Sequence, residues 1–496
     1  MSTLVEALLQ ASRTSEGVTF VDRDEEQFFP YLQILERARR VAGGLRAIGV
    51  ERGERVGITI PTSIAFYDAF FGLLFAGATP VSLPLPPPFG DRATHNRNVE
   101  GMLSQCDGRL ILSRKRLDEL PSGEDAQVEP HPDELALIQF SSGTTEGPKP
   151  IPLTHRQVLA NVRALLGGFL SAYPEHDGFR HIGVSWLPLY HDMGLIGAVL
   201  AAMAHPGPLF LLKPEQFIAR PASWLRAISH YGATLSAAPH FAYELCLERI
   251  RDEDLEGVDL SCWRLALDGA EMVGPRTLDR FTERFARFGL RREALTPVYG
   301  LAEAALAVTF GDPHAPPSVR ERDGQQVVSC GRPLPGYQVR IAQGGRILIR
   351  GPSIMKGYLG MPEESSMILR DGWLDTGDLG FIEDGELYVC GRSKELVVVR
   401  GRNYSPTLIE RTVKELPGVF AVVAVNVATD RGEKLALLIE SEGEAFEAKV
   451  RSQVSGTLGI DPDYLVFVAP GKLPRTTSGK LRRNDAARLV SPSIRV

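Results

Sequence analysis

The chain has 496 residues, of which 44% are hydrophobic, and its formal net charge at pH 7 is −6. This length exceeds what one hydrophobic core supports, so two or more domains are expected, and the slightly acidic balance excludes the strongly basic surface of a typical nucleic-acid-binding protein. Five scattered cysteines without a CxxC pair argue against a disulfide framework or a zinc site and for a reducing cytoplasm.

Neither the first residues nor the apolar runs predict export or a membrane span. Residues 1–10 include Glu6 and lack the basic start of a signal peptide. The longest apolar run, residues 195–204, is shorter than the roughly 20 residues that a transmembrane helix needs. We therefore expect a cytoplasmic protein.

Apolar strands alternate with amphipathic helices from about residue 42 to residue 306. Residues 55–60 read as a strand that leads into a helix over 64–75, and residues 178–186 and 233–238 read as further strands. This alternation favours α/β layers with largely parallel sheets.

A run of small, polar and glycine residues at 140–149, FSSGTTEGPK, is the most informative stretch of the chain. A predicted buried strand over 135–140 precedes it, and a predicted helix over 156–169 follows it. Glycine amides, hydroxyl groups and a lysine charge together can hold an anion. The run differs from the GxxxxGK[ST] loop of P-loop ATPases, and the competing interpretation is a polar surface turn. The candidate phosphate-binding residues are Ser141, Ser142, Gly143, Thr144, Thr145 and Lys149.

The pattern changes after residue 326. Short strands interrupted by Gly and Pro up to residue 389 predict a small β-barrel or antiparallel sheet. After residue 392 a compact α+β segment is expected, with strands over 395–400, 419–427 and 434–440 and a helix over 405–416. The predicted division is therefore 1–392, with the barrel-like part at about 327–392, followed by a small domain over 393–496.

Seven further motifs follow the loop in a fixed order. They are WLPLYHDMGL at 186–195, DGAE at 268–271, YGLAE at 299–303, WLDTGD at 373–378, GRSKE at 391–395, GRNYSPTLIE at 401–410 and LPRTTSGKLR at 473–482. Each motif alone is unspecific, but the ordered set resembles the adenylate-forming superfamily of acyl-CoA synthetases, peptide-synthetase adenylation domains and luciferases. The first and sixth motifs resemble its fatty acyl-AMP ligase branch most closely, and the resemblance spans about residues 20–483.

The resemblance implies a large N-terminal domain of two α/β subdomains and a small distorted β-barrel. A small, mobile α+β domain would follow, with a hinge at Lys394 and the catalytic Lys480. Members of the superfamily join a carboxylate to AMP with release of pyrophosphate, a reaction that depends on positioning and charge neutralisation rather than on a protein nucleophile. His191 would border the carboxylate and the α-phosphate and hydrogen-bond the developing charge.

The resemblance also assigns the nucleotide and metal contacts. A tyrosine offers a flat face for adenine, and a carboxylate can accept both ribose hydroxyls, which fits Tyr299 and Asp378. Glu303, with Thr144, would bind Mg²⁺, and Arg392 would contact ribose or phosphate. The remaining residues expected around the adenine are Gly269, Ala270, Glu271, Gly300, Leu301 and Ala302.

The acyl pocket is expected to be apolar, so a neutral fatty or aryl acid is favoured. Its candidate residues are Leu189, Met193, Ile196, Ala237, Ala238 and Phe241.

The sequence leaves three hypotheses for the whole reaction. In the first, the acyl group passes to the phosphopantetheine thiol of an acyl carrier protein after the small domain rotates and withdraws the lysine. In the second, the acceptor is CoA. Members of the ligase branch usually carry an insertion that is held to disfavour CoA, and the corresponding segment here, residues 312–326, is short. The third is a nucleotide-binding relative without catalysis, and Lys149, Glu303, Asp378, Arg392 and Lys480 argue against it.

Overall fold

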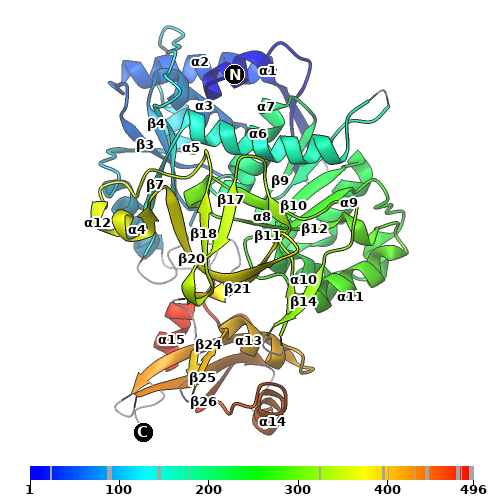
Figure 1. Ribbon diagram of the computed structural model, residues 1–496. Helices are drawn as coiled ribbons and strands as arrows, with labels where there is room; N and C mark the ends of the chain where they lie inside the picture. The colour runs from blue at the N-terminus through cyan, green and yellow to red at the C-terminus, as the bar shows by residue number, and fades with distance from the viewer. Residues whose placement is uncertain are drawn as a thin grey trace.

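The computed structural model describes residues 1–22, 25–86, 92–141, 147–176, 178–322, 325–393, 397–399, 402–429, 432–441, 446–475, 481 and 483–490. The described residues up to β21 (Glu386–Arg392) form a large body, and the elements that follow form a smaller body beside it (Figure 1). Over the described ranges, no helix combines the length and the apolar character needed to cross a membrane.

A nine-stranded sheet forms one layer of the large body, with the order β16-β13-β12-β11-β10-β8-β9-β1-β2. Six neighbouring strands of this sheet, in the order β12-β11-β10-β8-β9-β1, pair in parallel. Their carboxyl ends therefore lie at the same edge of the sheet. The strands are β1 (Gly17–Asp22), β2 (Glu25–Pro30), β8 (Gly183–Ser185), β9 (Leu209–Leu212), β10 (Leu235–Pro239), β11 (Leu265–Gly269), β12 (Leu295–Gly300), β13 (Ala307–Phe310) and β16 (Arg332–Pro333). The predicted parallel α/β layer is confirmed, although β8 is shorter than the strand predicted over 178–186.

A second sheet, ordered β5-β3-β4-β6-β7, is parallel except for the antiparallel pair β6 and β7. Its strands are β3 (Arg55–Thr59), β4 (Thr79–Ser82), β5 (Leu110–Ser113), β6 (Leu135–Phe140) and β7 (Pro150–Thr154). The predicted strand over 135–140 thus matches β6, and β6 and β7 carry the candidate phosphate loop between them.

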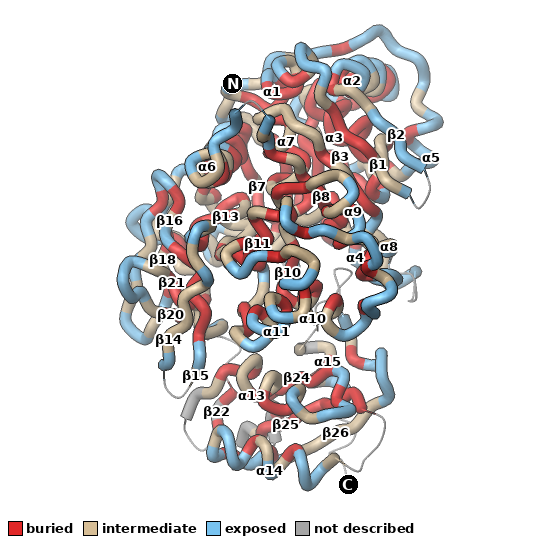
Figure 2. The backbone as a smooth tube through the Cα atoms, turned by 90° about the vertical axis from the view of Figure 1, so that its right-hand side faces the viewer, coloured by how far each residue is buried: buried red, intermediate tan, exposed pale blue. Residues whose placement is uncertain are grey.

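Helices fill the space around the two sheets. They are α1 (Leu4–Ala11), α2 (Tyr31–Ala47), α3 (Ile64–Ala76), α4 (Arg92–Ser104), α5 (Arg114–Asp118), α6 (His155–Ala172), α7 (Ala201–Ala204), α8 (Pro214–Ala219), α9 (Ala222–Tyr231), α10 (His240–Arg249), α11 (Pro275–Ala286) and α12 (Pro362–Ile368). Helix α6 contacts strands of both sheets, and one hydrophobic core runs through both layers, as the buried stretches in the centre of Figure 2 show. The two sheets therefore form one rigid unit around α6.

An antiparallel sheet of β17 (Gln338–Ile341), β18 (Arg346–Arg350), β19 (Leu369–Arg370), β20 (Trp373–Glu383) and β21 (Glu386–Arg392) follows, as predicted for this region. A hairpin of β14 (Val319–Arg322) and β15 (Gln325–Val328) precedes it. The hairpin accounts for part of the short segment 312–326.

The smaller body has hydrophobic cores made only of residues from Val397 onward. It contains β22 (Val397–Val399), β23 (Arg402–Tyr404), α13 (Pro406–Lys414), β24 (Val419–Thr429), β25 (Gly432–Ser441), α14 (Glu447–Leu458), β26 (Tyr464–Val468) and α15 (Arg483–Val490). These elements agree with the predicted α+β segment, and their separate cores are what an independently moving domain requires.

Candidate active site

Three predicted residues meet at the carboxyl edge of the large sheet. Tyr299, near the end of β12, donates its hydroxyl hydrogen to Oδ2 of Asp378 at 2.7 Å, and Nε of Arg392 donates to Oδ1 at 3.1 Å. Tyr299 and Asp378 are buried. Burial, together with the neighbouring Asp378 carboxylate, raises the pKa of Tyr299 well above its usual value, so its hydroxyl stays a donor. The Asp378 carboxylate is thereby fixed in orientation.

A second cluster links the candidate metal residue to the candidate phosphate loop. Glu303 lies in a 3₁₀ turn, Ala302–Ala304, directly after β12, and Oε1 accepts a hydrogen bond from the Tyr358 hydroxyl at 2.9 Å. The Nζ atom of Lys149 lies 5.4 Å from the centre of the Tyr358 ring. Tyr358 therefore joins two predicted residues that are 154 positions apart in the chain.

The Glu303 carboxyl group lies in a largely desolvated place. Burial raises the pKa of its carboxyl group, although the Tyr358 hydroxyl and the Arg392 charge act in the opposite direction. A desolvated carboxylate gains most from a nearby cation. No group of three or more His, Cys, Asp or Glu side chains in the described ranges could hold a metal alone. The arrangement suits Mg²⁺, which commonly takes one or two carboxylates and completes its shell with phosphate oxygens and water.

The sequence interpretation missed Tyr358. It lies in the KGYLG loop between β18 and α12, and Leu359 beside it donates its backbone N–H to Pro150 O at 3.0 Å. Met355, in the same segment, donates to the backbone oxygen of Glu303 at 2.8 Å. A tyrosine between two glycines carries no recognisable spacing signal, so only the folded chain reveals the contact.

The ends of the phosphate loop are closed by reciprocal hydrogen bonds. The Ser141 N–H donates to Lys149 O at 3.0 Å, and the Lys149 N–H donates to Ser141 Oγ at 3.1 Å. Between them, the predicted residues Ser142, Gly143, Thr144 and Thr145 lie outside the described residues. The loop is thus held at a fixed width by the first and last of its predicted residues.

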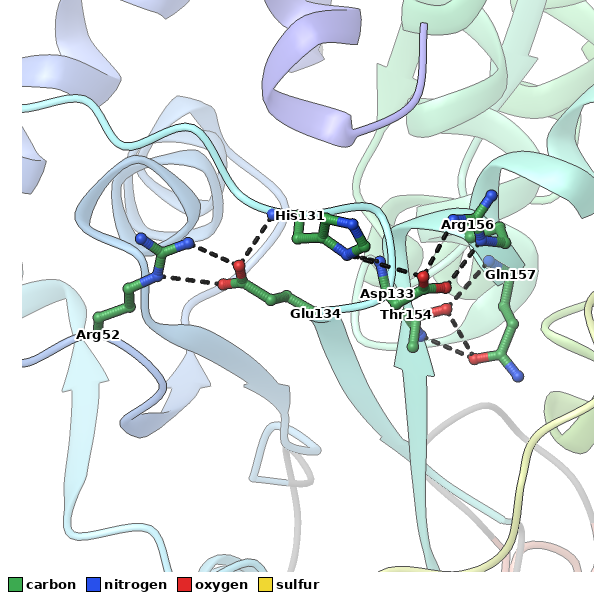
Figure 3. Close-up of polar contacts among 7 residues, drawn as sticks. All are labelled: Arg52, His131, Asp133, Glu134, Thr154, Arg156 and Gln157. Carbon is green, nitrogen blue, oxygen red and sulfur yellow. Dashed lines mark hydrogen bonds and ion pairs between the residues drawn. The ribbon is translucent and has the colours of Figure 1, made fainter.

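The opposite end of the β6–β7 pair is anchored by polar contacts (Figure 3). Arg52 pairs with Glu134 at 2.6 Å, and Arg156 pairs with Asp133 at 2.7 Å. Thr154 and Gln157 cap α6 reciprocally, since each side chain bonds a backbone N–H of the other residue. These contacts fix the base of the two strands, so the loop at their far end starts from a rigid support.

The candidate adenine loop begins where β11 ends. Gly269 is required there because a Cβ atom would lie 2.8 Å from Val298 Cγ2, and Ala270 next to it has a positive φ of 62°. Oε2 of Glu271 accepts a hydrogen bond from the Phe241 N–H at 2.9 Å. Gly300, Leu301 and Ala302 form the neighbouring turn, in which the Leu301 N–H donates to Leu306 O at 2.8 Å.

Two buried side chains hold this loop: Asp268, the first residue of the predicted DGAE motif, and His240, which the sequence interpretation did not single out. His240 Nδ1 lies 2.7 Å from Asp268 Oδ2, and His240 Nε2 accepts the Gly274 N–H at 3.0 Å. Because Nε2 accepts from a backbone amide, the ring proton sits on Nδ1 and is donated to Asp268. A histidine directly after a strand has no distinguishing pattern, so this support could not be predicted.

His191 lies just before a π-helix, Met193–Leu200, and its side chain is 44% exposed. Its Nδ1 atom lies 3.9 Å from Asp192 Oδ1, and its backbone oxygen accepts the Leu195 N–H at 2.8 Å. The imidazole is therefore accessible to a ligand. π-Helical turns are rare and occur frequently at functional sites.

An apolar cavity lies between α6, the π-helix, α7 and strands β8 to β11. Of the predicted acyl-pocket residues, Met193 and Ala237 line it. Leu189, Ile196 and Ala238 are instead buried in the hydrophobic cores, and Phe241 packs edge-on against Trp186. The sequence interpretation missed other lining residues, among them Leu166, Phe169 and Leu170 of α6. Helix α6 is distant in sequence from the predicted pocket residues, and only the folded chain places it beside the cavity.

The smaller body touches the large one beside the adenine loop. Arg411 of α13 donates to the backbone oxygen of Met272, and Lys414 Nζ lies 2.6 Å from Glu244 Oε2. Lys394 and Lys480, the predicted hinge and catalytic residues, lie outside the described residues.

Comparison with known proteins shows which family this chain belongs to. Residues 9–359 match the model of the AMP-binding enzyme family. A long-chain-fatty-acid–AMP ligase of Mycobacterium marinum is 33% identical over 94% of this chain and 92% of its own length. A putative fatty-acid–CoA ligase of Mycobacterium tuberculosis is 31% identical over 94% of this chain and 93% of its own.

Solved structures show the same similarity. A structure from work on fatty acyl-adenylate ligases of E. coli and L. pneumophila superposes with a TM-score of 0.90 at 32% identity, covering 99% of this chain and 98% of the other. The similarity therefore extends over both bodies of the molecule.

Proposed function

The chain belongs to the AMP-binding enzyme family, and from this membership we propose that it activates a hydrophobic carboxylic acid as acyl-AMP and passes the acyl group to a carrier-protein thiol. The predicted superfamily, its fold and its class as an acyl-AMP ligase are confirmed, and the nucleotide it uses is ATP. The proposal rests above all on the fixed Tyr299–Asp378–Arg392 cluster, which presents a carboxylate at the sheet edge.

In this proposal Asp378, whose carboxylate is oriented by Tyr299 and Arg392, accepts the two ribose hydroxyls, because one carboxylate can take several donors. The Tyr299 ring stacks on adenine, which the loop of Gly269, Ala270 and Glu271 borders on the other side. Ser141 and Lys149 hold the ends of the loop that surrounds the phosphates.

Glu303 is the proposed Mg²⁺ ligand, with Thr144 as its partner from the phosphate loop. The support is the burial of the Glu303 carboxylate and its single side-chain donor, Tyr358, among the described residues. When bound, Mg²⁺ would neutralise phosphate charge, and the neighbouring Lys149 would add a second positive charge.

The proposed chemical step is an in-line displacement. An oxygen of the carboxylate attacks the α-phosphorus of ATP, the bond from that phosphorus to the bridging oxygen breaks, and pyrophosphate leaves with the electron pair. His191 and Lys480 would stabilise the charge that builds up on the attacked phosphate. No protein side chain needs to form a covalent bond.

The acid is proposed to be a neutral fatty or aryl acid, because the cavity beneath the adenine loop is lined mainly by apolar side chains. Met193 and Ala237 would contact the chain close to its carboxyl end.

The acceptor is proposed to be the phosphopantetheine arm of a carrier protein, with CoA as the alternative. The motifs at 186–195 and 401–410 support the carrier, and the short segment 312–326 supports CoA. Transfer requires the smaller body to rotate about Lys394, which would break the Arg411 and Lys414 contacts seen here.

ATP–pyrophosphate exchange measured across a panel of carboxylic acids tests the first half-reaction. Exchange should appear with apolar acids in wild type. Incubation with ATP, a medium-chain acid and CoA should then accumulate acyl-AMP with little acyl-CoA. Addition of a carrier protein whose phosphopantetheine arm has a free thiol should consume the acyl-AMP. Stoichiometric acyl-CoA would favour the alternative acceptor, and no exchange with any acid would contradict the proposal.

A further inference from the structure

Helix α13 of the smaller body docks on helix α10 of the large body and beside the adenine loop. Arg411 of α13 donates to the backbone oxygen of Met272, next to that loop. Lys414, three residues further along α13, has its Nζ atom 2.6 Å from Glu244 Oε2 and 3.2 Å from Glu248 Oε1. The two glutamates are one turn apart on α10, so the ammonium group lies between two carboxylates of one helix.

The packing between the two bodies is close at this point. A Cβ atom at Gly274 would lie 3.0 Å from His240 Nε2 and 3.4 Å from Arg411 Cζ. The segment after the adenine loop is thus enclosed between a buried histidine of the large body and a guanidinium group of the smaller body. Beside it, Glu415, directly after α13, pairs with Arg276 of α11. The end of α13 is therefore held by charges from two helices of the large body.

The central ion pair of this contact is charged at neutral pH. Burial acts to raise the pKa of Glu244, but the Lys414 ammonium group outweighs burial, and the pKa falls to about 2. Burial acts to lower the pKa of Lys414, but the carboxylates of Glu244 and Glu248 raise it above its usual value. The Lys414 and Glu244 side chains are only 31% and 26% exposed, so water and salt screen their attraction less than that of a surface pair.

Helix α13 also holds the segment that follows Lys480. Arg483, three positions after Lys480, donates from Nε to Glu410 Oε1 at 2.9 Å and from Nη2 to Glu410 Oε2 at 2.8 Å. The same Nη2 atom donates to Thr407 Oγ1 at 3.0 Å. Glu410 and Thr407 both belong to α13. Because three residues of extended chain span at most about 11 Å, the position of Arg483 limits the positions that Lys480 can reach.

The docked arrangement turns this part of the smaller body toward the large body. Both views place α15, which begins at Arg483, on the side of the smaller body next to the large one (Figures 1 and 2). The same helix, α13, therefore contacts the large body beside the adenine loop and anchors the start of α15. In the proposed mechanism Lys480 acts on the attacked phosphate, so this is the arrangement that acid activation needs.

We propose that Arg411, Lys414 and Glu244 are positioning residues for acid activation: they hold α13 beside the adenine loop and thereby bring Lys480 to the reacting phosphate. The inference rests on the proposed function, because it assigns the docked arrangement to the first of the two proposed half-reactions. Weaker contacts should lower the fraction of molecules in which Lys480 is in place. The ATP contacts within the large body should stay intact.

The first test measures kcat and the KM for ATP in ATP–pyrophosphate exchange with a medium-chain acid. Lys414→Glu places a third carboxylate beside Glu244 and Glu248, so kcat should fall about ten-fold, while the KM for ATP stays within about two-fold of wild type. Adding Glu244→Lys reverses the pair and should bring kcat back to within about three-fold of wild type, which also shows that the chain is folded.

The matched control is Lys449→Glu, the same substitution in the same body. Lys449 is exposed on α14, and α14 lies at the end of the smaller body remote from the large one (Figures 1 and 2). This variant should exchange as wild type does.

The second test asks whether Lys414 acts through Lys480. In a Lys480→Ala background, Lys414→Glu should lower exchange by less than about two-fold further, because no lysine is left to position. A full ten-fold loss in that background would overturn the inference. It would also be overturned if Lys414→Glu exchanged as wild type does, or if Glu244→Lys failed to restore kcat. Absence of exchange by wild type with every acid would instead contradict the proposed function itself.

Discussion

The nucleotide end and the acyl end of the candidate site are built in different ways. Side chains at the nucleotide end are held by one another: Tyr299 and Arg392 fix Asp378, and Tyr358 bonds Glu303. The acyl cavity is shaped by small and apolar residues such as Ala202 and Ala237, which contribute space rather than polar contacts.

This difference separates two kinds of specificity. Preformed hydrogen bonds orient a polar ligand and lose strength sharply when one partner is removed. An apolar cavity discriminates weakly for each methylene group, so it tolerates related acids. Substitutions at the nucleotide end should therefore reduce the rate for every acid, and substitutions in the cavity should redistribute activity among acids.

The largest effect is expected for Lys480→Ala. Loss of a positive charge at the transition state should lower exchange activity on the order of a hundred-fold or more, while ATP binding is largely retained. Steady-state exchange and nucleotide titration provide the measurement, with the exposed Lys472→Ala of the same domain as control. Near wild-type activity would remove Lys480 from the mechanism.

Asp378→Asn should weaken ATP binding about thirty-fold for every acid, because the proposed ribose acceptor, which is buried and oriented by Tyr299, loses its charge. The KM for ATP reports the change. Asp384→Asn is the control, since Asp384 lies at the exposed turn after β20 and pairs with Arg320. A change confined to some acids would contradict the division between the two ends.

Glu303→Gln should raise the Mg²⁺ concentration for half-maximal exchange about five-fold, because the neutral amide is a weaker ligand for a hard cation. Glu383→Gln, a change of the same kind at an exposed ion pair with Arg320, should leave the titration unchanged. If both variants titrate as wild type does, the metal role belongs to another residue.

Ala202→Leu tests the acyl end of the candidate site instead of the nucleotide end. Three added carbons on its wall should shorten the preferred acid by about three methylene groups without changing the KM for ATP. The control is Ala204→Leu, two residues further along α7 and outside the cavity lining. An equal loss for short and long acids would mean that the cavity does not hold the chain.

The nucleotide end of the candidate site was predicted from sequence better than the acyl end. The β6 strand, the antiparallel sheet after residue 326 and the choice of Tyr299 and Asp378 as site residues rest on ordered local motifs. The fold then brings the Tyr299 and Asp378 side chains into contact, which the motifs alone did not predict. Tyr358 and His240 were missed because each acts through a partner far away in the chain.

The acyl pocket was predicted least well, for a physical reason. Its walls come from α6, the π-helix and four strands, and apolar residues of any buried helix have the same pattern as those that face a cavity. Ile196 and Ala198, two positions apart, illustrate this, since Ile196 is core and Ala198 lines the cavity. The π-helix itself has no sequence signal that separates it from an α-helix.

A change in stability rather than in activity is expected at α6, which contributes one wall of the cavity. His155 at its start is buried, and its Nδ1 atom accepts the Leu4 N–H at 3.1 Å. Burial lowers the pKa of His155 to about 4, against the raising influence of the Glu134 and Glu6 carboxylates. The folded protein therefore keeps this ring neutral at a pH where the unfolded chain, with a pKa near 6.5, binds a proton.

The sign of the pH dependence follows from these two pKa values. The contribution of His155 is complete above about pH 6.5 and is lost as the pH falls toward 4, by about 3 kcal/mol in total. His155→Gln should melt a few degrees below wild type at pH 7.5, and this gap should narrow at pH 4.5, because glutamine does not titrate. Thermal melts of both proteins at several pH values provide the measurement. A gap that stays constant with pH would mean that His155 titrates alike in the folded and unfolded chains, and that the start of α6 does not depend on its neutral ring.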